Sequence, residues 1–445
     1  MTNRSDITYF GAGPALLPTE VLQKAAQALV NYEHTGLGLS EHSHRSTIAS
    51  NVLEQTKSDL ARYLEIPRDR YEILFMQGGG TGQFSATVYN LVAIWVERRK
   101  QKILKELELC EKNHDEDLIL NELRKAVSED LKIDYLVTGS WSLKASQEAT
   151  RLLGSKHVNI ATDSREVNQG KFGRIPDEAT WKLSKDPAMV YYCDNETVDG
   201  VEFPGLPLCF GSGGDKKDNE LCVDPILVAD MSSNILSRRF PIERFSLIFF
   251  GAQKNLGTTG ITVVIIKKNL LPPFVKTPDA ELLRKLGLPI CPIIFSYEAM
   301  AKNNSLYNTL SIFDIYVAGQ VLERLLQKYP NGVDGQEVVS NEKAKLIYTT
   351  LDAYPEIYHI VADKNARSRM NICFRIKLGS NSIDISEKKF LQGAQEKLGL
   401  QGLEGHRSVG GIRASNYNSI SLMDAKKLAD YIRDFAVSPE ASVVN

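Results

Sequence analysis

The sequence predicts an α/β fold in which a large domain is followed by a smaller α+β domain. The chain has 445 residues, which is too long for one ordinary core. Through roughly the first three hundred residues, short apolar runs alternate with amphipathic stretches, as strands alternate with helices in an α/β sheet. From about Leu310 onward, a helix over 316–328, a strand-like run over 370–376 and a helix after Ser386 indicate the separate small domain.

The candidate strands of the large domain are short runs of apolar residues. All but the last lead directly into a polar or glycine-rich turn. Ligands of open α/β sheets bind at the carboxyl ends of strands, so we expect the chemistry of the protein in these turns. In chain order the runs are 73–76, 135–138, 189–192, 226–229, 247–250 and 261–266.

Two segments, near 97–132 and 205–222, interrupt this alternation as insertions would. The first is densely charged and places isoleucine and leucine at roughly helical spacing, which predicts an exposed helical hairpin. The second contains a glycine-rich, charged run at 211–218. Because no apolar helix follows that run, a surface loop is favoured over a phosphate-binding turn.

Composition limits the partners and the compartment. Lys plus Arg total 53 against 55 for Asp plus Glu, so bulk charge gives no reason to expect a nucleic acid partner. The 6 cysteines have no C-x-x-C spacing, which indicates reduced thiols and no metal site. The N-terminus lacks an apolar signal core, and no apolar run approaches the roughly 20 residues that span a bilayer. We therefore expect a cytoplasmic protein without membrane segments.

The turn after the first candidate strand reads Gln-Gly-Gly-Gly-Thr-Gly-Gln over 77–83 and opens a helix. Free backbone N–H groups and the helix dipole at such a position can hold a phosphate. The run matches neither the dinucleotide-binding fingerprint nor the Walker pattern. A simple tight turn is the alternative.

Lys254 lies between two apolar runs, in the sequence Gly-Ala-Gln-Lys-Asn-Leu-Gly over 251–257. The glycines let the backbone approach a ligand closely. Desolvation disfavours the ammonium form of a lysine, which lowers its pKa from about 10 and favours addition of the amine to a carbonyl. Taken alone, Lys254 also fits a surface lysine.

Three further turns each place one functional group after a strand. Asp230 either caps a helix or holds a pyridinium nitrogen protonated. Trp141 either stacks on a ligand or belongs to the core. Thr197 offers a hydroxyl to a ligand or serves as a turn or cap residue. A phosphate-binding turn, a stacking ring, a hydroxyl, an acid and a lysine, in that order, are together the components of a pyridoxal phosphate site.

Several motifs carry a family resemblance: Ser-His-Arg-Ser at 43–46, the glycine run at 77–83, Asn-Glu-Thr at 195–197, Ala-Asp-Met-Ser-Ser at 229–233, Gly-Ala-Gln-Lys-Asn at 251–255, Tyr-Asn-Thr at 307–309, Arg-Ser-Arg-Met-Asn at 367–371 and Gly-His-Arg-Ser-Val-Gly-Gly-Ile-Arg-Ala-Ser at 405–415. The chain resembles the phosphoserine aminotransferases, a branch of the fold-type I pyridoxal phosphate enzymes in the class V aminotransferase group. This resemblance runs from Phe10 nearly to the C-terminus. It implies a large mixed-sheet domain over 16–310 and a small α+β domain made of 1–15 plus 311–445.

By this resemblance, Lys254 carries pyridoxal phosphate as a Schiff base, Asp230 pairs with the pyridine nitrogen and Trp141 stacks on the ring. Thr197 bonds the side of the ring that bears the hydroxyl. The resemblance also implies a homodimer whose subunits share their active sites. The residues implied at the cofactor phosphate are Gly80, Thr81 and Gln253, together with Asn308 and Thr309 from the partner subunit.

The resemblance also implies the residues that hold the substrate, namely His406, Arg407 and Arg413, together with His44 and Arg45 from the partner subunit. Two departures from the family pattern concern loops. Leu310 and Ser311 stand where the family often has two prolines, and Cys373 stands where it often has one. We expect these departures to alter local loop geometry and not the chemistry.

The implied reaction moves an amino group between L-glutamate and 3-phosphohydroxypyruvate and gives O-phospho-L-serine and 2-oxoglutarate, a step of L-serine biosynthesis. Two rivals are serine:glyoxylate transamination and cysteine desulfuration on the same fold. No cysteine has the basic, glycine-rich setting of a nucleophilic thiolate. A third rival is a cofactor-binding protein without turnover, which would not need the dense set of histidines and arginines.

Overall fold

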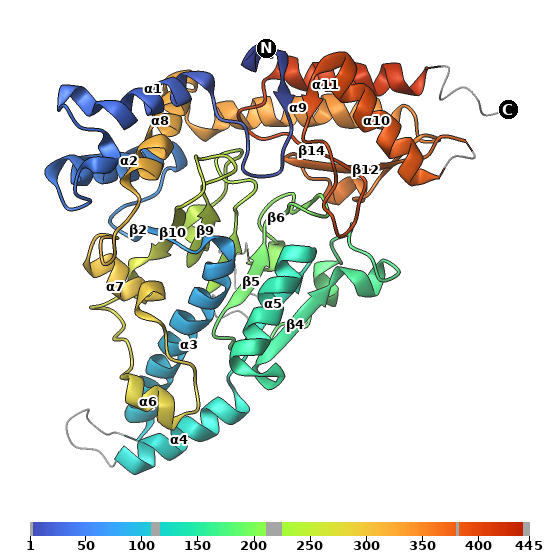
Figure 1. Cartoon of the computed structure of the whole chain (residues 1–445). Coiled ribbons are helices and arrows are strands. Elements are labelled where there is room, and N and C mark those ends of the chain that lie inside the picture. Colours follow the sequence, from blue (N-terminus) through green and yellow to red (C-terminus); the bar gives the residue numbers. More distant parts are fainter. Residues whose placement is uncertain (1–2, 108–115, 211–224, 380–381, 439–445) are drawn as a thin grey trace.

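The computed structural model describes residues 3–107, 116–210, 225–379 and 382–438, and Figure 1 shows their arrangement. The expected hairpin at 97–132 corresponds to the end of α3 and to α4, and residues 108–115 lie outside the described residues. Ile103, Leu104 and Leu123 on these two helices are buried, so the apolar spacing marks their packed faces. The glycine-rich run 211–218 also lies outside the described residues.

In the described part of the chain, a mixed sheet of seven strands forms the centre of the large domain, in the order β2-β10-β9-β8-β5-β3-β4. β10 is antiparallel to β2 and β9, and the other pairs are parallel, so six strands run in one direction and their carboxyl ends meet at one edge. All the candidate strands are confirmed. The bounds are β2 Tyr71–Met76, β3 Ile133–Val137, β4 Val158–Asp163, β5 Val190–Cys193, β8 Leu227–Asp230, β9 Leu247–Gly251 and β10 Thr262–Lys267.

The edge strand β4 is absent from the strands that the apolar pattern predicts. It contains Asn159, Thr162 and Asp163, and its Ile160 is exposed. An edge strand buries less of its surface than a central one, so it needs fewer apolar residues and leaves a weaker pattern in the sequence.

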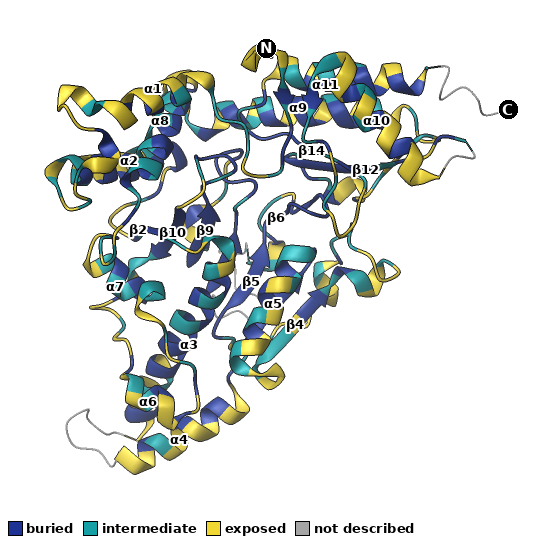
Figure 2. Cartoon of the chain, viewed as in Figure 1, coloured by how far each residue is buried: buried dark blue, intermediate teal, exposed yellow. Residues whose placement is uncertain are grey.

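Each face of the sheet has its own apolar core, because successive side chains of a strand point to opposite faces. Ile73 and Phe75 of β2 lie in one core with α1, α2 and α8, whereas Leu74 and Met76 lie in the other with α3 to α7. Figure 2 shows the buried strands between helices with exposed outer faces. The helices are α1 Thr19–Val30, α2 Thr47–Leu64, α3 Gly79–Glu106, α4 Glu116–Glu129, α5 Ser140–Leu153, α6 Ala280–Lys285, α7 Tyr297–Lys302 and α8 Ile312–Lys328.

The small domain, within the described residues, has the three-stranded antiparallel sheet β11-β12-β14, packed against α9, α10 and α11. The N-terminal segment joins it, because β1 pairs with β13 and Phe10 is buried in its core. The division between 310 and 311 remains a proposal, and the packing of α8 in the large-domain core favours a boundary beyond that helix. The bounds are β1 Thr8–Tyr9, α9 Val333–Asp352, β11 Tyr358–Ile360, β12 Asn371–Ile376, α10 Ile383–Leu398, β13 Leu400–Gln401, β14 Ile412–Ser415 and α11 Leu422–Ala436.

Candidate active site

Lys254 lies in the turn that joins β9 to β10, at the carboxyl edge of the sheet. The residue is 9% exposed, and its Nζ atom donates a hydrogen bond of 2.7 Å to Oγ1 of Thr197. Burial lowers the pKa of this amine below its usual value, and the nearby carboxylate of Asp230 opposes that shift. A lowered pKa increases the neutral fraction of the amine, which is the form that attacks a carbonyl.

Asp230 is the last residue of β8 and is buried. Its Oδ1 atom accepts a hydrogen bond of 2.9 Å from the backbone N–H of Ser232, so it caps a turn while it faces the site. Burial raises the pKa of this carboxyl, whereas hydrogen bonds from Ser232 and the charge of Lys254 lower it. A cation beside the carboxylate stabilises its ionised form, so the position suits a protonated ring nitrogen.

A glycine-rich turn connects β2 to α3. Gly78 and Gly79 have φ angles of 102° and 63°, in the left-handed region that glycine tolerates. A Cβ atom on Gly80 would lie 3.8 Å from Oδ2 of Asp230, so the first turn of α3 lies beside that carboxylate. The free N–H groups and positive dipole end of a long helix suit a phosphate there. The other residues expected at the phosphate are Thr81, which is exposed, and Gln253, which is partly buried.

Two buried carboxylates fix the start of α5, on which Trp141 is the second residue. Glu196 accepts hydrogen bonds of 2.8 Å from the backbone N–H groups of Trp141 and Ser142. Asp199 accepts one of 2.7 Å from the N–H of Ser140. Burial and the charge of Asp199 raise the pKa of Glu196 to about 8. Acids at a helix N-terminus satisfy its free donors, so this pair orients the helix that carries the indole.

The indole of Trp141 is partly buried. Its Nε1 atom is buried and has no hydrogen-bond partner among the described residues. Phe84 packs against the ring with centroids 6.4 Å apart, and Nζ of Lys144 lies 4.3 Å from the ring centre. Gly139, which precedes α5, leaves room for Glu196, because a Cβ atom there would lie 2.3 Å from Cγ of Glu196. The backbone therefore holds this ring in place, which suits stacking on a planar ligand.

Arg413 lies on β14 and reaches the large domain. Its Nη1 atom donates a hydrogen bond of 3.4 Å to the backbone carbonyl of Thr197, whose hydroxyl contacts the buried lysine. His406 and Arg407 lie in the segment before β14. Burial lowers the pKa of His406, and the positive charges of Arg413, Lys144 and Arg407 lower it further. Lys144, Arg407 and Arg413 thus form a cationic cluster around His406 that suits an anionic substrate.

The four residues expected from a partner subunit lie before α2 and before α8. His44 and Arg45 precede α2, and no hydrogen bond or ion pair in the described ranges joins them to Lys254. Nδ2 of Asn308 donates a hydrogen bond of 2.6 Å to Oε1 of Gln77, at the start of the glycine-rich turn of the same chain. The fourth, Thr309, is exposed. Their assignment to the site of a partner subunit remains a proposal.

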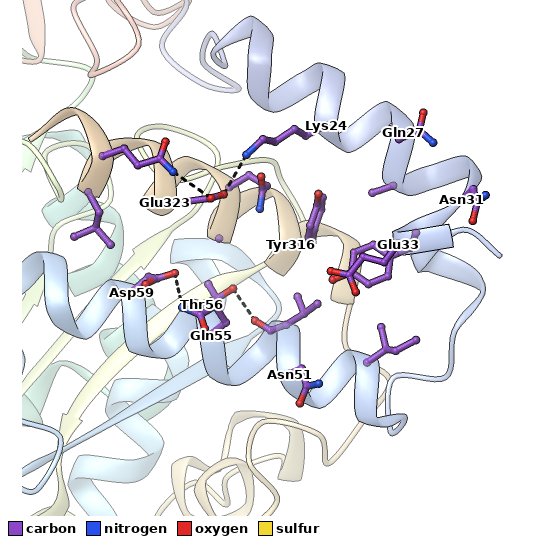
Figure 3. A pocket seen from close by; sticks show the side chains of 18 of the residues that line it. Lys24, Gln27, Asn31, Glu33, Asn51, Gln55, Thr56, Asp59, Tyr316 and Glu323 are labelled. Carbon is purple, nitrogen blue, oxygen red and sulfur yellow. Dashed lines mark hydrogen bonds and ion pairs between the residues drawn. The ribbon is translucent and has the colours of Figure 1, made fainter. Parts of the chain in front are cut away.

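A polar cleft of about 1140 Å³ lies elsewhere, between α1, α2 and α8 (Figure 3). Its charged groups include the ion pair between Lys24 and Glu323, at 3.2 Å, and Asp59, which accepts a hydrogen bond of 3.0 Å from Gln55. None of the expected site residues lines it. The cleft is therefore separate from the group around Lys254, and its size does not mark the active site.

The residues at the sheet edge fit pyridoxal phosphate. The buried amine of Lys254 matches the aldehyde of the cofactor, and the carboxylate of Asp230 matches its ring nitrogen. The indole of Trp141 matches the planar face of the ring, and the start of α3 matches the phosphate. Gly80 leaves the space next to Asp230 free of a side chain. The set of groups therefore matches the cofactor in its chemistry.

The sequence-based set lacks some residues of this site. The sequence carries a signal for Glu196 and Asp199, because these two acids near Thr197 follow a run that is predicted to be a strand. Lys144 had none, since a lysine on an amphipathic helix is ordinarily a solvated residue. Ser232 belongs to the Ala-Asp-Met-Ser-Ser motif at 229–233, in which only Asp230 has a predicted role.

Residues 7–110 and 114–428 match the family model of the class-V aminotransferases. The match covers nearly all of the described fold, including the segments that carry Lys254, Asp230 and Arg413. The fold and the site thus define a class-V aminotransferase, which is a pyridoxal phosphate enzyme of fold type I.

The chain is 41% identical to the phosphoserine aminotransferase of Saccharomyces cerevisiae over 97% of this chain and 98% of that protein. It resembles the solved phosphoserine aminotransferase from Bacillus circulans subsp. alkalophilus, with a TM-score of 0.75, 32% identity and coverage of 96% and 97%. A PLP-bound phosphoserine aminotransferase from Trichomonas vaginalis gives a TM-score of 0.74, 32% identity and coverage of 95% and 99%. The chain therefore belongs to the phosphoserine aminotransferase family, and the predicted fold class is confirmed. Within the described ranges, none of the helices combines the length and the hydropathy that a bilayer crossing requires.

Proposed function

We propose that this protein transfers the amino group between L-glutamate and 3-phosphohydroxypyruvate, giving O-phospho-L-serine and 2-oxoglutarate in L-serine biosynthesis. The proposal rests on two contacts of Thr197. Its hydroxyl contacts the amine of Lys254, and its carbonyl contacts the guanidinium of Arg413. A buried amine and a carboxylate-binding arginine are what an amino-acid aminotransferase needs side by side. The full-length similarity to phosphoserine aminotransferases supports the substrate.

We assign pyridoxal phosphate to the carboxyl edge of the sheet, with Lys254 as the residue that holds it. The cofactor supplies a protonated ring that withdraws electrons from the substrate Cα. Asp230 would stabilise the positive charge on the ring nitrogen, and Trp141 would stack on the ring. Lys254 would hold the cofactor, and its Nζ atom, once free, would take the proton from the substrate Cα as a general base and deliver it as a general acid to the cofactor carbon that receives the amino group. Burial lowers the pKa of this amine and so increases its neutral fraction, which is the form that a general base requires.

Arg413 binds the α-carboxylate that glutamate and phosphoserine share, through the paired N–H donors of its guanidinium. Its Nε atom is buried and has no partner among the described residues, so a donor is available to the substrate. In both substrates two chain atoms separate Cα from the carboxyl carbon or the phosphorus, so one cationic cluster serves both distal anions. We assign that cluster to His406 and Arg407 with His44 and Arg45 of the partner subunit. A phosphate monoester carries nearly two charges, so it engages more of the cluster than glutamate does.

We also propose a homodimer whose active sites are completed across the interface. Within one chain, Arg407 and Arg413 lie near His406, whereas no hydrogen bond or ion pair of the described residues joins His44 or Arg45 to them. In the proposed dimer, the second subunit brings those two residues to the substrate. The cytoplasmic location is proposed from the sequence alone.

Three of the four described thiols disfavour cysteine desulfuration on this fold. Burial raises the pKa of Cys193 well above its usual value and raises the pKa of Cys373 and Cys291 to about 12. A thiol with a raised pKa is rarely the thiolate that attacks sulfur. Serine:glyoxylate transamination is the rival that an experiment must separate.

The test measures 2-oxoglutarate formed by the purified protein from L-glutamate with either 3-phosphohydroxypyruvate or glyoxylate as the acceptor. We expect kcat/KM for the phosphorylated acceptor to exceed that for glyoxylate by about 100-fold or more, because glyoxylate lacks the distal anion and leaves the cationic cluster unpaired. Arg407→Ala should reduce the ratio of kcat/KM for 3-phosphohydroxypyruvate to kcat/KM for glyoxylate. Comparable values for the two acceptors in the unchanged protein would refute the proposed substrate.

A further inference from the structure

The small domain holds the hairpin that carries Thr197. The strands β6 (Asn195–Glu196) and β7 (Val201–Glu202) form this hairpin, and Thr197 lies at its tip, next to Lys254. Both strands contact the segment 367–371, which leads into β12 of the small domain. The contact therefore joins the two domains at the base of the hairpin whose tip carries Thr197.

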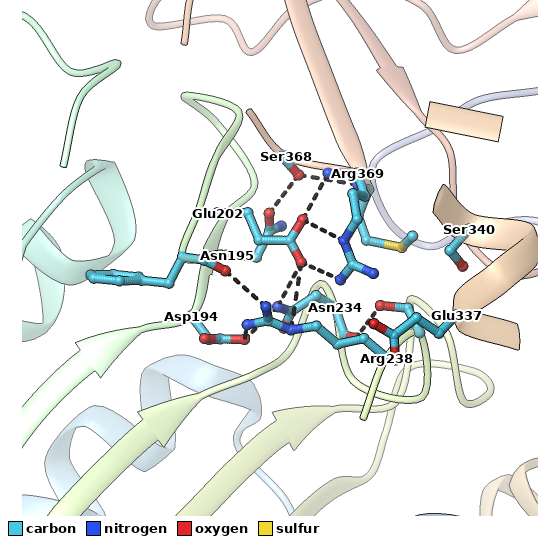
Figure 4. A network of polar contacts seen from close by, with 12 residues as sticks. Asp194, Asn195, Glu202, Asn234, Arg238, Glu337, Ser340, Ser368 and Arg369 are labelled. Atoms are coloured by element: carbon cyan, nitrogen blue, oxygen red, sulfur yellow. Dashed lines mark hydrogen bonds and ion pairs between the residues drawn. The ribbon is translucent and has the colours of Figure 1, made fainter. Parts of the chain in front are cut away.

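Glu202 is the centre of this contact, as Figure 4 shows. It is 3% exposed, and its oxygens accept hydrogen bonds of 2.7 Å and 2.6 Å from the backbone N–H and Nη2 of Arg369. From the large domain, Nδ2 of Asn234 donates to it at 3.1 Å, and Nε of Arg238 lies 3.9 Å away. Arg238 is itself paired with Asp194 at 2.6 Å. One buried carboxylate is thus bound by a cation from each domain.

The other strand of the hairpin is bound by the same segment. Oδ1 of Asn195 accepts a hydrogen bond of 2.5 Å from Oγ of Ser368, and its Nδ2 donates one of 2.8 Å to Oδ1 of Asn371. The backbone N–H of Ser368 also donates to the carbonyl of Gly200, at 2.9 Å. The hairpin is therefore fixed on both sides of its tip.

The segment 367–371 is continuous with the strand pair that positions Arg413. β12 is antiparallel to β14, with Asn371 opposite Ser415 and Cys373 opposite Arg413. A shift of the hairpin relative to this segment therefore changes the distance between Thr197 and Arg413. Because interdomain surfaces move readily unless strong contacts join them, the buried carboxylate is well placed to prevent that shift.

The carboxylate of Glu202 is buried and has several hydrogen-bond donors. Burial alone would raise the pKa of this carboxyl, but the charges of Arg369 and Arg238 hold it below the usual value. Removal of one cation from such a pair leaves a buried charge with too few partners, which is costly. Loss of Arg369 should therefore loosen the hairpin locally.

We propose that Glu202 and Arg369 are positioning residues of the active site. Their ion pair fixes the hairpin against the small domain, and so sets the hydroxyl of Thr197 and the guanidinium of Arg413 at their distances from Lys254. The inference rests on the proposed function, because that function gives Thr197 and Arg413 their roles.

The first test measures hydrogen exchange of the peptide 195–202 by mass spectrometry in the protein without cofactor. Arg369→Met should increase the exchange rate of this peptide by about tenfold or more, since a hydrogen-bonded charge is lost. The matched control is Arg367→Met: the backbone of Arg367 bridges to Val201 of the hairpin and is kept in the variant, whereas its side chain pairs with Asp352 at 2.7 Å and not with the hairpin. The control should change the rate by less than about twofold, and Arg369→Lys should lie between the two.

The second test measures turnover with the cofactor bound. Arg369→Met should raise KM for L-glutamate and lower kcat, whereas a merely structural role would lower the melting temperature and leave both constants unchanged. If Arg369→Met fails to fold, Glu202→Gln replaces it, with the same expected results. Equal exchange in the two methionine variants, or faster exchange with unchanged KM and kcat, would overturn the inference. Absence of turnover in the unchanged protein would instead refute the proposed function, whatever the exchange rates are.

Discussion

The Nζ atom of Lys254 donates its hydrogen bond to Thr197 over 2.7 Å, and both side chains are buried. This bond orients the amine. We expect Thr197→Val to lower kcat about tenfold, because the amine loses the partner that holds it in its reactive position. Thr197→Ser keeps the hydroxyl and should retain most of the activity. Steady-state kinetics at saturating cofactor compare the two, and equal kcat values would show that the hydroxyl has no such role.

The lowered pKa of Lys254 predicts how the cofactor-free protein responds to pH. The protonated amine is the charged form, so burial makes the amine neutral at a lower pH than an ordinary lysine, whose pKa is about 10.4. The rate of covalent attachment of pyridoxal phosphate should therefore rise with pH and level off before that value. Stopped-flow absorbance measures the rate of attachment, with Nα-acetyl-lysine, whose side-chain amine is free, as the reference. A midpoint at or above that of the reference would contradict the burial argument.

Gly139 has no room for a side chain, because a Cβ atom there would lie 2.3 Å from Cγ of Glu196. Gly139→Ala should lower the free energy of unfolding by about 1–3 kcal/mol, the usual cost of an overpacked site, and displace the start of the helix that carries Trp141. Gly205→Ala is the control, since nothing lies within 4 Å of a Cβ atom at that position. Urea unfolding measures both variants. Equal stabilities would mean that Glu196 moves aside without cost.

The positions of the chemical groups could be predicted where a local pattern marks them. Asp230 and Lys254 each follow an apolar run, and such runs end at one edge of a parallel sheet, so their proximity follows from the topology. Glu202 and Arg369 could not be paired in this way. Their contact joins two domains through segments that are distant in the sequence, and neither residue lies in a pattern that distinguishes a buried ion pair from two solvated charges.

The proposed sharing of active sites predicts complementation between inactive variants. Lys254→Ala and Arg45→Ala should each be inactive as homodimers. If Arg45 serves the partner's site, a mixed dimer contains one site with both residues intact, and mixing should restore part of the activity. Two different affinity tags prove subunit exchange and isolate the mixed dimer. An isolated mixed dimer without activity would place Arg45 in its own chain's site or outside both sites.

The central claim is that Lys254 holds pyridoxal phosphate, and borohydride trapping tests it most directly. Borohydride makes the link between the cofactor and its lysine permanent, and digestion followed by mass spectrometry identifies the modified residue. We predict one major modified peptide, with the label on Lys254, and its loss in Lys254→Ala while the variant keeps the circular dichroism spectrum of the unchanged protein. A label on another lysine in the unchanged protein, or equal labelling of Lys254→Ala, would contradict the account.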